Sequence, residues 1–283
     1  MGRDDLVLCS GTLRRGVPFD ERLSAAAGAG FAAVSLWGRD HAAARAEGWS
    51  DADLRSMLDA HGLSVAELDP AWWWLPGAAD VHIPPEADEQ DVFRFGEREL
   101  FGLADVFGAR SINAVDVFGG TWDLDDAAES FAGLCRRAAE HGLLVHLEWL
   151  PWSKIPDLTT ALEIVRRAGA PNGGLNVDAW HFTRAGVKPD ELAGVDGQLI
   201  LGIQLDDGPP EPEANLVEAT LHARELPGEG GFDLGAIVQA LAATGTEAPV
   251  GVEVFSDRLH ERPAAEAAMS AARATRGVLE RHR

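Results

Sequence analysis

Short apolar runs recur along the whole chain, and a longer segment rich in polar residues or alanine separates each run from the next. Runs of roughly four to eight apolar residues between turn signals are typical of buried strands. The first run, residues 6–9, is followed by an Ala-rich segment that stops at Gly30, as a helix does. We expect eight strands, at residues 6–9, 31–37, 63–68, 111–115, 143–148, 174–177, 199–204 and 250–254.

The segments between these runs carry start and stop signals of helices. Ser50 is a favoured N-cap residue, Leu54, Met57 and Leu58 follow at helical spacing, and Gly62 supplies the stop. An acidic first turn, favourable at the positive end of a helix, begins the segment after residue 121. We expect helices at residues 19–30, 50–62, 88–107, 121–142, 157–171, 189–192, 233–243 and 263–281, and a short one around 215–221.

Two stretches, residues 69–85 and 206–231, lack either pattern and are rich in proline or glycine. The first contains four prolines and the run Trp72-Trp73-Trp74. Irregular segments of this length are uncommon in compact domains and are often functional. We therefore predict that residues 69–85 form a lid.

Strict alternation of strands with helices specifies parallel strands with helical crossovers, and eight such units close into a barrel. No shift of composition marks a domain boundary, so we predict one (β/α)8 TIM barrel, of the α/β class, over residues 1–283. A doubly wound open sheet is the alternative. It is disfavoured because the Gly-x-Gly-x-x-Gly pattern expected after its first strand is missing at Ser10-Gly11-Thr12.

Oxygen-bearing side chains end four successive predicted strands: Glu148, Asp178, Gln204 and Glu253. In a barrel the carboxyl ends of all strands meet at one rim, so these side chains should converge. Three carboxylates and one amide oxygen suit a hard divalent ion such as Mn²⁺ or Mg²⁺. Any one of them could be an ordinary polar strand end, but carboxylates crowded together without a cation would repel each other.

Charge and cysteine content narrow the classes of partner. The net charge of −22 argues against binding nucleic acid or an anionic membrane surface through bulk electrostatics. No stretch approaches the roughly 20 apolar residues of a membrane span. Cys9 and Cys135 lie far apart and match no zinc or redox spacing, which fits a reducing compartment. We expect a soluble cytoplasmic protein.

Several motifs together resemble the sugar phosphate isomerase/epimerase family of the xylose-isomerase-like TIM barrels. They are His146-Leu-Glu148, the segment from Gly174 to His181, Gln204-Leu-Asp206-Asp207-Gly208, the segment from Arg224 to Gly230, and Val-Glu253-Val. The resemblance implies one divalent metal ion held by Glu148, Asp178, Gln204 and Glu253, with Mn²⁺ expected and Mg²⁺ or Co²⁺ as alternatives. Gln204 departs from the family pattern, which has histidine there, and should disfavour softer ions.

The same resemblance implies that His181 and Arg224 contact the substrate. Lys154 stands where the ketose 3-epimerases have glutamate, and it is either a group that recognises an anionic or carbonyl-bearing substrate or a solvated loop lysine. Asp206 shares a strand face with Gln204 and could orient it. Trp37 and Trp73, near strand ends, could cover a sugar face, although tryptophans at such positions often serve packing alone.

His146 should point to the same side of its strand as Glu148, one layer deeper in the barrel. There it is either a general base or a buried histidine that hydrogen-bonds a neighbouring strand.

The resemblance implies an enzyme that removes a proton next to a metal-bound carbonyl of a small sugar, keto-sugar or cyclic polyol and forms an enediolate. Glu148, Glu253 or His146 would be the base. Return of the proton elsewhere gives an isomerase or epimerase, whereas loss of a β-substituent gives a lyase, like the 3-dehydroshikimate dehydratases or the enzymes that cleave 3-keto-C-glycosides. A non-catalytic binding module is the third hypothesis. Self-association, or a partner subunit that completes the pocket, stays open from sequence.

Overall fold

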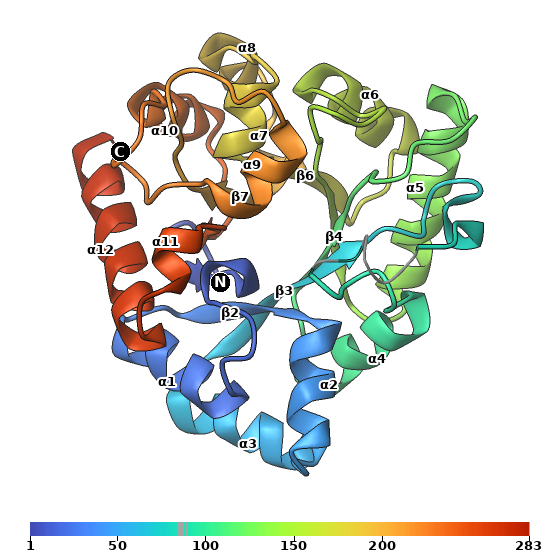
Figure 1. Cartoon of the computed structure of the whole chain (residues 1–283). Helices are drawn as coiled ribbons and strands as arrows, with labels where there is room; N and C mark the ends of the chain where they lie inside the picture. Colours follow the sequence, from blue (N-terminus) through green and yellow to red (C-terminus); the bar gives the residue numbers. More distant parts are fainter. Residues whose placement is uncertain (84–87, 89, 283) are drawn as a thin grey trace.

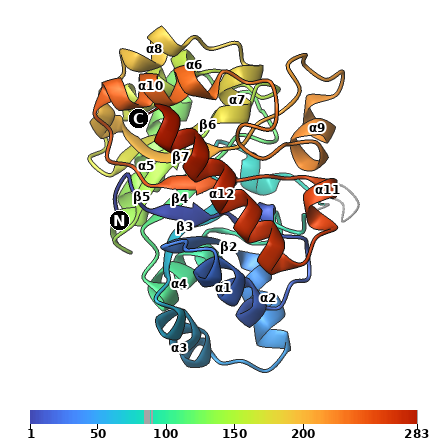
Figure 2. The same ribbon diagram turned by 90° about the vertical axis from the view of Figure 1, so that its left-hand side faces the viewer.

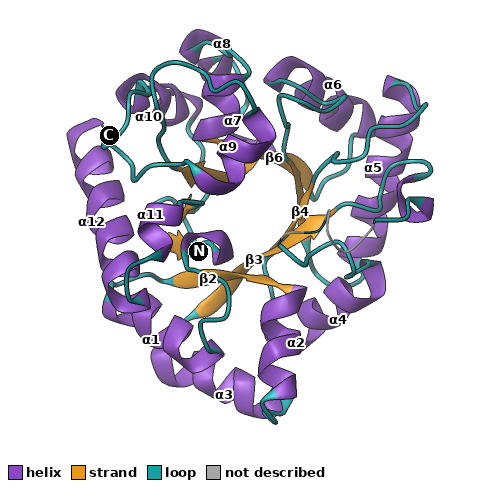
Figure 3. Ribbon diagram, viewed as in Figure 1, coloured by secondary structure: helices purple, strands orange, loops and turns teal. Residues whose placement is uncertain are grey.

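The computed structural model describes residues 1–83, 88 and 90–282, and over these residues eight parallel strands form a closed barrel. Each strand pairs with the next along the chain, and β8 pairs with β1 (Figures 1 and 3). The strands are β1 (Leu6–Leu8), β2 (Ala33–Trp37), β3 (Ser64–Ala71), β4 (Ser111–Ala114), β5 (Leu144–Leu147), β6 (Gly173–Asp178), β7 (Ile200–Leu205) and β8 (Val250–Val252). The predicted TIM barrel is confirmed.

Helices surround the barrel on the outside, and α12 crosses its flank in the side view of Figure 2. They are α1 (Phe19–Gly28), α2 (Gly38–Ala46), α3 (Asp51–His61), α4 (Glu97–Phe107), α5 (Leu124–Ala139), α6 (Leu158–Ala168), α7 (Ala179–Arg184), α8 (Pro189–Ala193), α9 (Leu216–His222), α10 (Leu234–Thr244), α11 (Asp257–His260) and α12 (Ala264–His282). The predicted start and stop signals hold at α3, where Ser50 caps the helix and Gly62 ends it with φ 65°.

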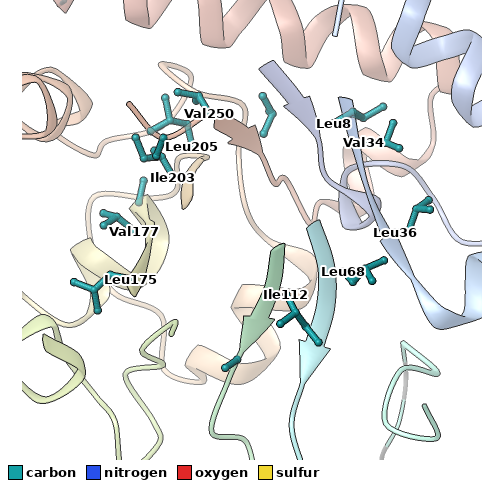
Figure 4. Packing of buried hydrophobic residues seen from close by; sticks show 14 of the residues in the cluster. Leu8, Val34, Leu36, Leu68, Ile112, Leu175, Val177, Ile203, Leu205 and Val250 are labelled. Atoms are coloured by element: carbon teal, nitrogen blue, oxygen red, sulfur yellow. The ribbon is translucent and has the colours of Figure 1, made fainter. Parts of the chain in front are cut away.

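Strand residues alternate between two environments, because successive side chains on a strand point to opposite faces. One set is apolar and belongs to the main hydrophobic core, from which Figure 4 shows Leu68, Ile112 and Val177. Loss of one such side chain to alanine typically costs roughly 2–5 kcal/mol of stability. The other set points into the barrel and is largely polar. Groups able to bind a ligand or transfer a proton are therefore found inside the barrel.

The helices differ from the sequence prediction at several places. The predicted helix at 88–107 begins as α4 only at Glu97, since Asp88 instead caps a turn by accepting from Val92 N and Phe93 N. α2, α7 and α11 were not predicted, because each is short; α2 and α7 also follow their strands directly, without an intervening turn signal. In the predicted lid, residues 69–71 extend β3, and residues 84 and 85 lie outside the described part of the chain.

Candidate functional site

The four predicted rim residues lie at neighbouring strand ends, as the barrel requires. Glu148 directly follows β5, Asp178 ends β6, Gln204 lies near the end of β7, and Glu253 directly follows β8. Asp178 and Gln204 are paired across adjacent strands. All four side chains are buried.

Glu148, Asp178 and His181 form a compact set of candidate metal donors. One donor atom from each lies within 4.8 Å of the other two. His181 is held there because Asp178 is the N-cap of α7, and its Oδ1 accepts a hydrogen bond of 2.8 Å from His181 N. Burial, opposed by Asp178 and aided by Arg224, lowers the pKa of His181 to about 4, so its ring is neutral and able to act as a donor.

Arg224 lies against the same carboxylates. Its Nη1 lies 2.8 Å from Asp178 Oδ2 and 3.5 Å from Glu253 Oε2, and it also donates to Asp206 Oδ2. Its Nη2 donates to Thr220 Oγ1 on α9. Asp206, predicted to orient Gln204, therefore pairs with the guanidinium of Arg224. The structure brings Arg224 into the predicted metal cluster itself.

Negative charge exceeds positive charge in this cluster, and the carboxyl pKa values respond. Burial, with the charges of Asp178 and Glu253, raises the pKa of Glu148 well above its usual range. Burial also raises the pKa of Glu253, to about 8, although Arg224 opposes the shift. For Asp178, burial alone would raise the pKa, but Arg224 and His181 outweigh it and the pKa is lowered. Buried carboxylates crowded in this way favour a divalent cation, and the donor set fits one.

Six polar side chains, Glu148 among them, form a closed ring of polar contacts across β3 to β7. Asn113 Nδ2 donates to Glu148 Oε2 (2.7 Å), and Asn113 Oδ1 lies 3.0 Å from His146 Nδ1. His146 Nε2 lies 3.1 Å from Glu67 Oε2. Gln204 Nε2 donates to Glu67 Oε1 (3.3 Å). Asn176 Nδ2 closes the ring by donating to Gln204 Oε1 (2.6 Å) and Glu148 Oε1 (3.4 Å). We refer to these six residues as the polar ring.

The polar ring fixes the orientation of the Gln204 amide. Its nitrogen faces the Glu67 carboxylate, and its oxygen lies on the side of Asn176, which also contacts Glu148. Gly202 makes room for this arrangement, because a Cβ there would lie 2.7 Å from Asn176 Oδ1. The amide oxygen is thus held beside one of the predicted ligands.

His146 is buried one layer below Glu148, as the strand period predicts. Both of its ring nitrogens have partners in neighbouring strands, Asn113 on one side and Ser111 and Glu67 on the other. It does not line the cavity over the site. Of the two roles left open by the sequence, the geometry favours the buried hydrogen-bonding residue.

A cavity of about 340 Å³ opens above the cluster. Glu148, His181, Arg224 and Glu253 line it, together with Asn113, Asp69 and the predicted Trp37. Its volume lies within the range of small-molecule sites, roughly 300–1,000 Å³.

Two predicted substrate-binding residues are not among those that line this cavity. Lys154 is exposed, and its Nζ donates to the carbonyl oxygens of Gly120 (3.0 Å) and Trp122 (2.6 Å). Trp73 packs in an aromatic cluster, and its Nε1 donates to Glu97 Oε2. The polar atom of Lys154 is thus bound by loop carbonyl oxygens, and that of Trp73 by a side chain of α4.

Glu67 and Asp69 are site residues that the sequence analysis missed. They lie on β3 and point into the barrel, and burial with the charge of Glu67 raises the pKa of Asp69 well above its usual range. The prediction ended this strand at residue 68 and assigned Asp69 to a loop. The acidic pair at i and i+2 next to an apolar strand was the available signal.

No helix in the described part of the chain is both long enough and apolar enough to cross a membrane.

Comparison with known proteins gives matches to several enzymes. A 3-dehydroshikimate dehydratase of Pseudomonas aeruginosa is 33% identical over 137 residues, which are 48% of this chain and 22% of that protein. An inosose isomerase of Bacillus subtilis is 30% identical over 147 residues, 51% of this chain and 52% of that protein. The chain thus spans about a fifth of the dehydratase and about half of the isomerase.

Solved structures share the fold over the full length. A structure described as the IOLI protein with a binding zinc atom superimposes with a TM-score of 0.83, covers 99% of both chains and is 20% identical. The family described as xylose isomerase-like TIM barrel matches residues 23–276. Since that match covers most of the sequence, the chain belongs to the xylose isomerase-like TIM barrel family.

Proposed function

We propose that this protein is a divalent-metal-dependent enzyme that isomerises or epimerises a small sugar, keto-sugar or cyclic polyol. The observation that carries the proposal is the convergence of Glu148, Asp178 and His181 within 4.8 Å under a cavity of about 340 Å³. The match to inosose isomerases supports the isomerase reading.

Glu148, Asp178 and His181, whose donor atoms lie within 4.8 Å of one another, would hold the ion. Glu253 and Gln204, the other two predicted ligands, would complete the set from the ends of β8 and β7. We propose Mn²⁺, with Mg²⁺ or Co²⁺ as alternatives, because oxygen donors dominate the set. When bound, such an ion acts as a Lewis acid that polarises a carbonyl oxygen.

The side chains around the cavity would transfer the proton, orient the ligands and exclude water. Glu148 and Glu253 are the carboxylates of the predicted ligand set that line the cavity, so each can accept or return a proton on a carbon next to a carbonyl. Arg224 orients Asp178 by its hydrogen bond, and its Nη2, which donates to Thr220 Oγ1, lies 3.4 Å from His181 Nε2. Trp37 and Phe255, stacked with ring centroids 5.8 Å apart, keep water from one wall.

A lyase or dehydratase is the second candidate function. The match to the dehydratase of Pseudomonas aeruginosa favours it. The same protein groups would remove the proton, and a β-substituent would leave in place of proton return. The outcome then depends on the substrate and not on a different set of residues.

The test is turnover of inososes and ketoses in D2O by protein stripped of metal and reloaded with Mn²⁺. We expect solvent deuterium at one carbon of the substrate and the recovered isomer, dependent on Mn²⁺ and lost in Glu148→Gln. Glu266→Gln, an exposed position on α12, is the matched control and should behave as the parent protein. Elimination products in place of an isomer would select the lyase, and metal-independent exchange would reject both candidates.

A further inference from the structure

The side chains that line the cavity are polar at its inner end and apolar at its outer end. At its inner end the lining side chains are polar and buried, among them Asn113, Glu148 and His181. At its outer end they are apolar, with Val217 45% exposed and Phe93, Val117, Trp152 and Leu221 half-buried. Isolated exposed apolar residues are ordinary, but a group of exposed and half-buried apolar residues around a binding cavity indicates a surface that an apolar ligand covers.

Separate segments of the chain contribute to this apolar mouth, which we define as Phe93, Val117, Trp152, Val217 and Leu221. Val217 and Leu221 lie one turn apart on α9. The others come from the segment before α4 and the loops after β4 and β5. Apolar side chains from three segments and from α9 therefore line one cavity.

The apolar mouth is continuous with the site. The Trp152 ring lies 5.4 Å from the His181 ring, centroid to centroid, in an edge-to-face arrangement. His181 is itself one of the candidate metal donors. A ligand whose polar end reaches the cluster would thus place its other end against Trp152 and α9.

The charges around the cavity disfavour an anionic ligand. Among the described residues that line it, Arg224 is the single lysine or arginine, and its guanidinium is bound by Asp178 and Asp206. Asp69, Glu148 and Glu253 line the inner end, and Glu218 lies on α9 at the mouth. Lys154, the cation that could have met a carboxylate or phosphate, donates to loop carbonyls instead.

We infer that the substrate is an uncharged polyol or keto-sugar that carries an apolar, flat substituent, such as an aryl group. Its hydroxyl and carbonyl groups face the buried cluster, and the substituent lies in the apolar mouth. A sugar phosphate or a ring carboxylate fits this cavity poorly. The inference rests on the proposed function, for which it names the class of substrate.

The test compares the affinity of the Mn²⁺-loaded protein for phenyl β-D-glucopyranoside, methyl β-D-glucopyranoside and glucose 6-phosphate by titration calorimetry. We expect the phenyl glycoside to bind at least about tenfold more tightly than the methyl glycoside, because the ring buries apolar area. Glucose 6-phosphate should bind more weakly than either. In Val217→Ser/Leu221→Ser the ratio of phenyl to methyl affinity should fall towards one. In the control Met269→Ser, an exposed position on α12, it should not change.

Three results would each overturn the inference. They are equal affinity for the two glycosides, no saturable binding of the phenyl glycoside at millimolar concentration, and tighter binding of glucose 6-phosphate. The affinity ratio is independent of turnover, so the two proposals can fail separately. Metal-dependent isomerisation with a ratio of one rejects the aryl substituent alone. A ratio of tenfold in a protein that shows no metal-dependent chemistry rejects the proposed function alone.

Discussion

Arg224 and Asp178 form a fully buried ion pair, with 2.8 Å between Nη1 and Oδ2. The same guanidinium nitrogen contacts Asp206 and lies 3.5 Å from a Glu253 oxygen. Arg224 therefore compensates part of the negative charge that the predicted metal ligands bring into the barrel. A bound divalent ion would then neutralise the negative charge that Arg224 leaves uncompensated.

Replacement of Arg224 by methionine should destabilise the fold, because it leaves Asp178 and Asp206 buried without their partner. Breaking a buried pair in this way typically costs about 3–5 kcal/mol. We expect the loss in urea unfolding of chelator-treated protein, and a larger stabilisation by Mn²⁺ in the variant than in the parent. Arg224→Lys, which keeps the charge, is the control and should lose less. Equal stability of Arg224→Met and the parent would show that the guanidinium carries no such role.

A second prediction concerns stability and pH in chelator-treated protein. Burial raises the pKa of Glu253 from 4.5 to about 8, so the folded carboxyl holds its proton more tightly than the unfolded one. This contribution to stability is fully present below pH 4.5 and is lost as the pH rises through about 8. Calorimetric Tm values should fall over this window, with a shallower slope in Glu253→Gln. An identical dependence of Tm on pH in the parent protein and in Glu253→Gln would contradict the assignment of this effect to Glu253.

A third prediction concerns the choice of metal. Gln204 offers an amide oxygen where the family pattern has histidine, so Gln204→His should shift preference from Mn²⁺ towards Zn²⁺ or Co²⁺. Competition dialysis with both ions measures the shift. Gln204→Leu removes the donor and also breaks the polar ring, and it should weaken binding of both ions alike. An unchanged preference in Gln204→His would place position 204 outside the coordination sphere.

Lys154 provides a test of side-chain placement. Its ammonium group lies 4.1 Å from the centroid of the Trp122 ring and donates to two carbonyl oxygens, so it stabilises the loop after β4. We expect Lys154→Met to lower Tm slightly and to leave KM and kcat unchanged, since exposed charge contacts contribute little. A marked rise in KM would instead support the role in substrate recognition that its place in the sequence suggested.

The sequence predicted the barrel, and it predicted that Glu148, Asp178, Gln204 and Glu253 lie at the ends of successive strands, because strand period and strand ends are local patterns. It did not predict the polar ring. Asn113 and Asn176 are ordinary residues along the chain and become significant only through the register that pairs β4 with β5 and β6 with β7.

Loops and short helices were the second limit of prediction. His181 was placed near a substrate, but only the start of α7 at Ala179 brings it to Asp178 and Glu148. Lys154 lies six residues after Glu148, a spacing that suggested a place in the site. Its side chain nevertheless donates to carbonyl oxygens of a neighbouring loop. The direction of a long side chain depends on partners that are distant in sequence.

The central claim, one divalent ion among these strand ends, is tested most directly by anomalous diffraction from crystals of the Mn²⁺-loaded protein. The account predicts a single strong peak in the barrel, within roughly 2.0–2.6 Å of oxygens of Glu148 and Asp178. It should disappear in Glu148→Gln crystals grown with the same ion. No peak at this place, or one bound only by surface carboxylates, would contradict the account.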